Sequence, residues 1–550
     1  MPLQGSGRGR RLFEPMNRAL ANIALALLCL FWLLVGVIGH EPWKGSDEDA
    51  FSLLVSARAA HDWIVPQMAG YRELQFPPLY TWVAQGFAAA FGPWLGLPNA
   101  ARLASPFFVG LALLATGLAA RRLYGPDHGW LGVLALMGTI GLLLPAHYMD
   151  ARLVPMAGAA IALWGAALLE SSPGRGGAVL GSGLGLIFLG GAVLEAVALL
   201  MLLPLLAALC AGCRRQPLFL GLLIAVLFAL PWFALWPWAL AQRQAVAFAL
   251  WWRQNLDALA WLAPSQATYE PTYYLRLILW FAWPLTPLAL WALYRARREA
   301  WLTPGIGLPV AFFFVPFVVL SLSASPEARK ALVLLPPLAL LAAHAMPQLK
   351  RGAAYAFLWF GVMTFTLIGL VTWVYFIAHD TGFPAVLAER LLHLQVVGVG
   401  DFRVWPMSAG LALTFAWVLG LPRLKRSVMR PLLIWNLGIA FAWALVVVQF
   451  MGIIEHNLSY RGMTQAISQA GPRARCYGTS GVGSSHRALF GYYLGVPFTP
   501  GMERTCGWYL VQKNRNTGGP PEPGRAWIER WQGSRPGDNN ERFWLYERRR

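Results

Sequence analysis

The sequence predicts a polytopic, all-α membrane protein of about thirteen transmembrane helices, followed by a small soluble α/β domain at the C-terminus. Two observations support this prediction. The 550 residues are 57% hydrophobic and only 13% charged, whereas a soluble domain normally carries about 25% charged residues. Apolar runs also recur along most of the chain, at the length of about 20 residues that a helix needs to cross a bilayer.

The apolar runs define the expected transmembrane helices. The first run is too long for the core of a signal peptide and lacks a small-residue cleavage site, so it predicts a retained helix. The expected helices cover residues 19–39, 100–120, 129–147, 152–169, 177–194, 196–212, 217–239, 273–294, 304–323, 331–347, 353–377, 406–421 and 431–453. Together they form a transmembrane domain that we place at residues 1–453.

The segment between the first two helices, residues 40–99, differs from an ordinary loop. Ala50–Trp63 and Pro78–Phe91 mix apolar and polar residues at helical spacing. Neither stretch is apolar enough to cross a bilayer. Both therefore predict helices that lie in the membrane interface.

Lys and Arg residues produce the net charge of +19, and they occur in short clusters between the apolar runs. With about thirteen helices, these clusters fall on one side of the membrane, which the positive-inside rule makes cytoplasmic. Scattered clusters of this kind also argue against a nucleic-acid partner. In a bacterium this arrangement predicts an inner-membrane protein whose C-terminal domain, residues 454–550, lies in the periplasm.

This C-terminal tail is polar and rich in Gly and Pro, with short apolar stretches at Trp508–Gln512 and Phe543–Tyr546. These stretches predict a small α/β domain. Two of the five cysteines, Cys476 and Cys506, lie in the tail. Because the periplasm is oxidising, we expect them to form a disulfide.

Acidic residues at the outer face are the first candidates for chemistry, because transmembrane proteins carry few of them. Ser46-Asp47-Glu48-Asp49 follows the first helix, and Asp150 lies at the outer end of the third. Helix capping explains part of the first group, and an ion pair with Arg152 would explain Asp150. The same positions suit a base, because backbone N–H groups and a helix dipole keep a carboxylate ionised.

Several motifs occur in an order that resembles a known family. They are Ser46–Phe51, His61–Pro66, Pro77–Trp82, Asp150–Leu153, Asn255–Leu256, Glu270–Leu275, Trp283–Leu285 and Ser323–Pro337. This series is similar to the lipid-linked-sugar-dependent glycosyltransferases of the GT-C fold, above all the lipid A aminoarabinose transferases and their protein mannosyltransferase-like relatives. The resemblance implies that a sugar moves from a polyprenyl-phosphate donor, such as an undecaprenyl-phosphate sugar, to lipid A or another cell-envelope glycan at the outer face.

The resemblance also implies roles for individual residues. Asp47 is the expected base, because its motif is matched best, and Glu48 is mainly a helix-start residue beside it. The expected site residues are Asp47, Asp150 and Glu48 for catalysis, Arg58, Arg329 and Lys330 for the donor phosphate, and Tyr80, Tyr273 and Tyr274 along the cavity. Each of the last six has a structural alternative, as a membrane anchor for the cations and as an interface aromatic for the tyrosines.

The sequence departs from the family pattern at three places. Gln75-Phe76 stand where relatives often carry Glu-Lys, Gly190-Gly191 replace a Lys-Gly pair, and Thr268 replaces a His. These replacements remove three polar or charged side chains that would contact the donor or the acceptor. This leaves a non-catalytic homologue as one alternative function.

Two further alternatives stay open, and no cofactor is required by the sequence. A protein O-glycosyltransferase would share the same fold. A transporter of lipid-linked substrate would instead carry inverted repeats and charges at the membrane midplane, where Glu195 is the main acidic candidate. No His or Cys cluster at the outer face has the spacing of a zinc site, but an acidic pair would suit a divalent cation.

Overall fold

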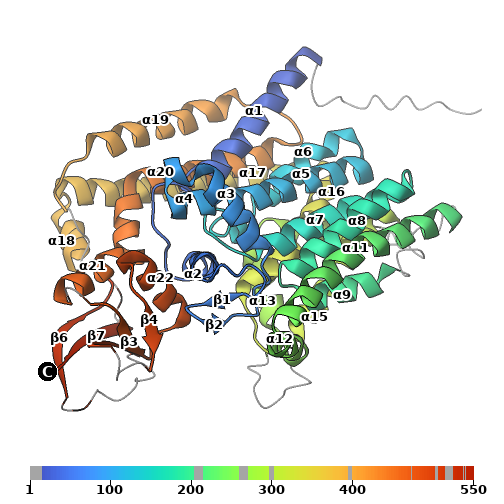
Figure 1. Cartoon of the computed structure of the whole chain (residues 1–550). Coiled ribbons are helices and arrows are strands. Elements are labelled where there is room, and N and C mark those ends of the chain that lie inside the picture. Colours follow the sequence, from blue (N-terminus) through green and yellow to red (C-terminus); the bar gives the residue numbers. More distant parts are fainter. Residues whose placement is uncertain are drawn as a thin grey trace, which may run out of the picture.

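Helices make up most of the computed structural model (Figure 1). It describes residues 15–203, 215–258, 270–296, 303–393, 399–471, 474–501, 506–514, 524, 526–536, 538 and 540–549. The helices before the C-terminal sheet are α1 (Pro15–Leu34), α2 (Ser46–Ala60), α3 (Leu79–Leu95), α4 (Leu97–Arg102), α5 (Ala104–Tyr124), α6 (Gly129–Met137), α7 (Leu153–Leu168), α8 (Pro173–Leu189), α9 (Val193–Met201), α11 (Arg215–Arg243), α12 (Ala245–Asp257), α13 (Tyr273–Phe281), α14 (Leu285–Arg295), α15 (Pro304–Ser321), the 3-10 helix η5 (Ala328–Leu334), α16 (Leu335–Ala345), α17 (Arg351–Thr381), α18 (Ala385–His393), α19 (Val404–Gly420), α20 (Arg430–Leu458) and α21 (Arg461–Ala470).

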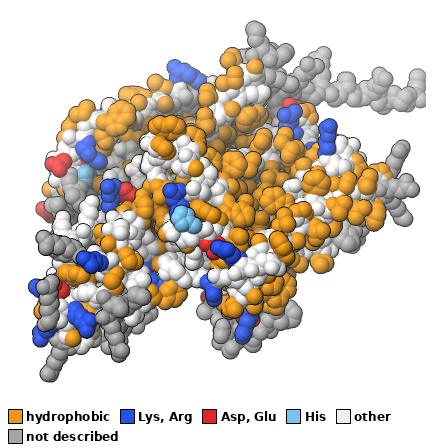
Figure 2. Space-filling model, in the orientation of Figure 1, with side chains coloured by type: hydrophobic (Ala, Val, Ile, Leu, Met, Phe, Trp, Pro, Cys, Tyr) orange, Lys and Arg blue, Asp and Glu red, His pale blue; other side chains and the backbone are white. Residues whose placement is uncertain are grey.

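Many of these helices are suited to a bilayer. Within the described residues, seven helical stretches are long and apolar enough to cross a membrane, or eight if the bent pair α13–α14 is one span. The predicted count of about thirteen is larger, and it included shorter apolar helices such as α7. Helices α17 and α19 bury little of their apolar surface inside the protein, and hydrophobic side chains dominate the visible helical face (Figure 2). The chain is therefore a multi-pass membrane protein, as predicted.

Two predicted helices are broken, so the prediction of continuous spans there was wrong. The helix predicted at residues 129–147 ends at Met137, where α20 packs against the chain. Trp435 Nε1 donates to the Gly138 carbonyl at 2.7 Å, and a Cβ at Gly138 would lie 2.9 Å from the Trp435 ring. The helix predicted at residues 273–294 bends by 102° between α13 and α14. Pro284 precedes α14 and has no N–H to continue a helix.

The segment 40–99 forms α2, the hairpin of β1 (Gln67–Met68) and β2 (Tyr71–Arg72), and α3. Helix α2, the hairpin, α12 and the C-terminal domain lie along one side of the helical part, called here the loop face, whereas α3 lies beside α4 (Figure 1). Helix α3 exposes Phe91 and Trp94, as an interfacial helix would. Helix α2 does not match that prediction, because Phe51 and Leu54 are fully buried and the C-terminal domain packs against it.

The C-terminal domain is a mixed sheet with helices beside it, which confirms the predicted α/β class. It contains β3 (Tyr477–Ser480), α22 (Ser484–Leu494), β4 (Phe498–Pro500), β5 (Trp508–Asn514), β6 (Trp527–Gly533) and β7 (Glu541–Arg548). The strand order is β4-β3-β5-β7-β6. Strand β3 runs parallel to β4 and β5, whereas β7 is antiparallel to both of its neighbours.

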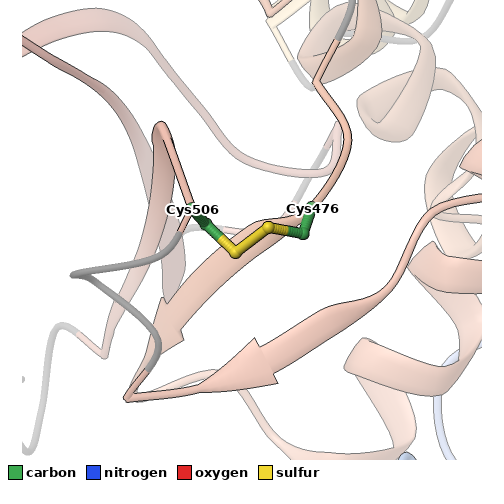
Figure 3. Close-up of a disulfide and its surroundings, with 2 residues drawn as sticks. All are labelled: Cys476 and Cys506. Atoms are coloured by element: carbon green, nitrogen blue, oxygen red, sulfur yellow. A yellow bond between two sulfur atoms is a disulfide. The ribbon is translucent and has the colours of Figure 1, made fainter.

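The predicted disulfide is present in this domain. Cys476 immediately precedes β3, and Cys506 lies just before β5 (Figure 3). Because β3 and β5 are paired, their starting ends lie side by side and bring the two Cα atoms to 5.5 Å. The bridge therefore closes the connection between two neighbouring strands.

Candidate functional site

Asp47, the predicted base, lies in the first turn of α2 with a side chain only 1% exposed. Arg102 of α4 pairs with it, donating from Nε to Oδ1 at 3.1 Å and from Nη2 to Oδ2 at 3.0 Å. The backbone N–H groups of Trp43 and Met149 donate to the same carboxylate at 3.0 and 2.9 Å. Each oxygen accepts two hydrogen bonds, so no lone pair is left for an acceptor proton. The geometry gives Asp47 a structural role in place of the predicted role as base.

Asp150, the second predicted acid, lies in the turn before α7 and is 2% exposed. Its Oδ1 accepts from the backbone N–H of Arg152 at 2.9 Å. Within the described residues its Oδ2 has no hydrogen-bond partner, although Arg329 Nη1 lies 3.8 Å away. Burial raises the pKa of Asp150, and the positive charge of Arg329 opposes that rise. Asp150 and Arg329 therefore lie close together, although the sequence analysis predicted them as site residues from different motifs.

Glu327 connects these residues to a second cation. Its carboxylate lies 2.6 Å from Arg329 Nη2 and 3.8 Å from Arg152 Nη2. The hydroxyl of Tyr274 accepts from the Glu327 N–H and donates to the Glu327 carbonyl, both at 3.1 Å. Tyr274 therefore fixes the backbone that carries Glu327, rather than lining a cavity as predicted.

Two more side chains complete the group. Lys330 Nζ donates to the carbonyl of Ser325 at 2.9 Å. Asp49, half-buried in α2, is close enough to Arg329 for electrostatic attraction. We call this group the charged cluster; its members are Asp49, Asp150, Arg152, Glu327, Arg329 and Lys330.

Three members of the charged cluster were not predicted as site residues. The sequence explains Asp49 as a capping acid and Arg152 as an ion-pair partner, and it assigns nothing to Glu327. A signal does exist in Pro326-Glu327-Ala328-Arg329-Lys330, where three charges stand beside an apolar helix. Such a group in a membrane protein is a candidate functional site by default.

A cavity of about 300 Å³ opens beside the charged cluster. Arg152, Lys330 and Glu195 are among the charged residues that line it, with Asn255 among the polar ones and Trp251 among the apolar ones. Glu195 belongs to the first turn of α9. Cations beside a partly apolar wall suit a ligand with an anionic head and an apolar tail.

The described departures from the family pattern surround Arg152. Its guanidinium lies over the Phe76 ring, 5.4 Å from the centroid, and Nη1 donates to the Gly191 carbonyl at 3.1 Å. A Cβ at Gly190 would lie 2.4 Å from Pro155 Cδ, so a lysine does not fit there without movement. Phe76 and Gly191 thus hold the Arg152 side chain in place at the cavity wall. Thr268 lies outside the described residues.

Two predicted site residues lie elsewhere. Arg58 is exposed near the end of α2, where Nη1 donates to Gln85 of α3 at 2.7 Å. Tyr80 is buried, with its hydroxyl 2.7 Å from the Ser105 hydroxyl and its ring stacked on Phe108. Neither residue lines the cavity. Exposed Arg58 fits its structural alternative, a cation at the surface of an interfacial helix, whereas buried Tyr80 is a core residue and neither lines the cavity nor lies at the interface.

Glu48 and Tyr273 also lie away from the cavity wall. Glu48 is 2% exposed and faces His486 of the C-terminal domain, with Oε1 and Nδ1 3.3 Å apart. Burial raises the pKa of Glu48 to about 7. Tyr273 packs edge-on against Tyr274, with ring centroids 5.1 Å apart. Glu48 therefore contacts the C-terminal domain, and Tyr273 supports the residue that holds Glu327.

The charged cluster is a set of ion pairs rather than an evident metal site. Among the residues that the structure describes, no group of three or more His, Cys, Asp or Glu side chains could hold a metal ion. Its cations can bind an anionic ligand, and its carboxylates can take up a proton.

Comparisons with known proteins show which chains this one resembles. No protein-family model matches the sequence. An undecaprenyl phosphate-alpha-4-amino-4-deoxy-L-arabinose arabinosyl transferase of Pseudomonas paraeruginosa (strain DSM 24068 / PA7) is 28% identical over 361 residues. This match covers 62% of the present chain and 62% of that relative.

Two solved structures share the architecture. ArnT from Cupriavidus metallidurans bound to undecaprenyl phosphate has a TM-score of 0.67 and 15% identity, over 97% of this chain and 98% of that one. The apo form of ArnT has a TM-score of 0.66 and 15% identity, over 96% and 98% of the two chains. At this level of identity the likeness establishes the architecture, and the chain accordingly has the GT-C fold of ArnT.

Proposed function

We propose that the protein is a glycosyltransferase that moves a sugar from a polyprenyl-phosphate donor to lipid A or another cell-envelope acceptor. The observation that carries this proposal is the pair Arg152 and Lys330 on the wall of a cavity, beside the buried carboxylate of Asp150 and the partly exposed carboxylate of Glu327. The fold of ArnT, solved with undecaprenyl phosphate, and the activity in the relative's name support the same substrate class. The donor sugar is an aminoarabinose or a related sugar.

The donor phosphate would bind between Arg152 and Lys330, with Arg329 near. Within the described residues, the buried Nε of Arg152 lacks a hydrogen-bond partner. Phosphate oxygens form strong, charge-assisted hydrogen bonds with such groups. The polyprenyl chain would leave the cavity toward the lipid, because it cannot leave the bilayer.

We assign the role of base for an acceptor hydroxyl to Asp49, which lies outside the cavity wall on α2. It is only half-buried, it is close to Arg329, and it is not saturated by an arginine as Asp47 is. The acceptor oxygen would bond to the anomeric carbon while the bond from that carbon to the phosphate oxygen breaks. The hydroxyl proton passes to Asp49, and the electron pair leaves on the lipid phosphate. Asp150 and Glu327 orient Arg329 beside this reaction.

The loop face would lie at the outer side of the bacterial inner membrane, with the C-terminal domain in the periplasm. The alternation of basic clusters along the sequence supports this orientation. The donor lipid and the acceptor would then meet at the membrane surface, next to α2 and α3.

A transfer assay tests the proposal. Purified protein in liposomes receives a synthetic undecaprenyl-phosphate aminoarabinose and lipid A, and mass spectrometry follows the product. We expect modified lipid A, and parallel reactions with EDTA or Mg²⁺ report any need for a divalent cation. Mass spectra of lipid A and of envelope glycoproteins from a deletion strain separate a lipid acceptor from a protein acceptor. No product from several polyprenyl-phosphate sugars would contradict the proposal.

A further inference from the structure

Glu195 is a buried acid on the wall of the same cavity as Arg152 and Lys330. Helix α8 ends at Leu189, and Gly191, with a φ of 89°, turns the chain into α9, whose first turn carries Glu195. Only 9% of Glu195 is exposed. Within the described residues, no Lys or Arg nitrogen lies within 4.0 Å of its carboxylate. A buried carboxylate without a counter-ion is costly unless it binds a proton or meets a cation.

A second acid lines the cavity, but it already has a partner. Asp257 Oδ2 lies 3.4 Å from Arg253 Nε, and 47% of the Asp257 side chain is exposed. Water therefore solvates this carboxylate, and a ligand's positive charge would add little there. Glu195, in contrast, is buried and has no such partner.

The cavity thus offers binding groups of three kinds. Arg152 and Lys330 suit a phosphate, and Glu195 suits a cation. The amide side chains of Gln254 and Asn255, from α12, can exchange hydrogen bonds with sugar hydroxyls. Its volume of about 300 Å³ falls in the range of small-molecule sites. The ligand that matches this wall carries a phosphate, hydroxyl groups and a positively charged amine.

We propose that Glu195 is a specificity-determining residue that binds the protonated amine of the donor sugar, so that the cavity selects amino sugars over neutral sugars. This inference rests on the proposed function, because the donor binds in the same cavity. A protonated amine forms a charge-assisted hydrogen bond with the carboxylate and neutralises it. A hydroxyl in the same place forms a weaker hydrogen bond and leaves a buried charge without a counter-ion.

A purely structural role of Glu195 makes a different prediction. In that case the carboxylate would only balance the positive charge of Arg152 and Lys330. Its removal would then change the binding of every polyprenyl phosphate, whichever sugar it carries. An amine-binding role changes the preference between two sugars instead, so the ratio of rates with two donors separates the two roles.

The experiment compares two synthetic donors in liposomes: undecaprenyl-phosphate 4-amino-4-deoxy-L-arabinose and undecaprenyl-phosphate L-arabinose, in which a hydroxyl replaces the amine. Glu195→Gln keeps the size of the side chain but removes its charge. The kcat/KM for the amino donor should therefore fall by about 10- to 100-fold, as expected for a lost hydrogen bond to a charged group. The kcat/KM for the neutral donor and the binding of undecaprenyl phosphate itself should stay close to wild type. Glu195→Asp keeps the charge and should retain part of the preference.

Glu170→Gln changes an exposed acid outside this cavity and should keep the wild-type ratio. An equal loss with both donors in Glu195→Gln, or a wild type that uses both donors equally, would overturn the inference. A loss of preference in Asp257→Asn but not in Glu195→Gln would also overturn it, because the amine would then bind the other acid. If wild type transfers neither donor, the proposed function fails. The affinities of the two donors for wild type and Glu195→Gln then still decide whether Glu195 binds the amine.

Discussion

At the scale of single residues, the remaining hydrogen-bonding capacity of each carboxylate decides which acid can react. Asp47 has none, because Arg102 and two backbone N–H groups occupy both of its oxygens. Asp49 is half-buried; burial raises its pKa, and the positive charge of Arg329 opposes that rise. The two acids lie in the same helical turn, and of the two Asp47 is the one that pairs with an arginine of α4.

Asp47→Asn should destabilise the protein. It would leave the Arg102 guanidinium buried opposite a neutral amide, and breaking a buried ion pair costs about 3–5 kcal/mol. Thermal unfolding in detergent measures the loss, with the exposed Asp127→Asn as the matched control. A variant that unfolds like wild type and loses only transfer would restore Asp47 as the base.

Asp49→Asn should reduce transfer by about 10²–10⁴-fold, as expected for a lost general base, while unfolding stays close to wild type. Burial raises the pKa of Asp49. Wild-type activity should therefore fall with decreasing pH at a value above the ordinary carboxylate range, because the base must be ionised. Rates across pH for wild type and variant check this. Undiminished transfer in Asp49→Asn would move the base to another residue.

The sequence could indicate these acids but not their partners. Asp47 and Arg102 are 55 positions apart, and nothing local links them. Asp150 was predicted because acidic residues are rare in such a chain, and Arg329 and Lys330 because the resemblance implies a pair of cations there. Their assembly around Glu327 follows from how η5 and α7 pack, which depends on the whole fold.

At the scale of elements, the apolar runs predicted the positions of most helices, because lipid requires a continuous apolar stretch. They did not predict the ends that depend on other elements. Helix α6 ends where Trp435 of α20 reaches Gly138, and α2 is covered by α22. Neither contact can be predicted from the pattern of apolar residues in one sequence.

The disulfide acts at this scale, since it joins the segments that lead into β3 and β5. Cys476→Ser combined with Cys506→Ser should destabilise the C-terminal domain by about 2–4 kcal/mol, because the bridge restricts the unfolded chain. Proteolysis of the domain against denaturant concentration measures the change, with Cys29→Ser as the control. Two freely labelled tail thiols in denatured, unreduced wild type would contradict the bridge.

At the scale of the whole molecule, the helical part and the C-terminal domain meet across α2 and α22 (Figure 1). The α/β class of the domain could be predicted from its short apolar stretches. The packing of this domain against α2 could not be predicted, because Glu48 and His486 are far apart in the sequence. Nothing near either residue indicates that the two side chains meet. The site is therefore assembled from segments along the entire chain.

Topology provides a prediction at the same scale. Alkaline phosphatase fused after residue 460 should be active, and the same enzyme fused after residue 350 should be inactive, because it folds only outside the cytoplasm. The alternation of basic clusters predicts this result. Reversed activities would place the loop face in the cytoplasm and remove the proposed site from the periplasm.

The most direct test of the central claim is the binding of undecaprenyl phosphate to purified variants. Arg152→Met keeps an unbranched, flexible but shorter side chain and removes the cation at the cavity wall, so affinity should fall by about 10- to 100-fold. Arg58→Met removes an exposed cation outside the cavity and should bind like wild type. Unchanged binding in Arg152→Met, together with lost binding in Arg58→Met, would contradict the placement of the donor site at the charged cluster.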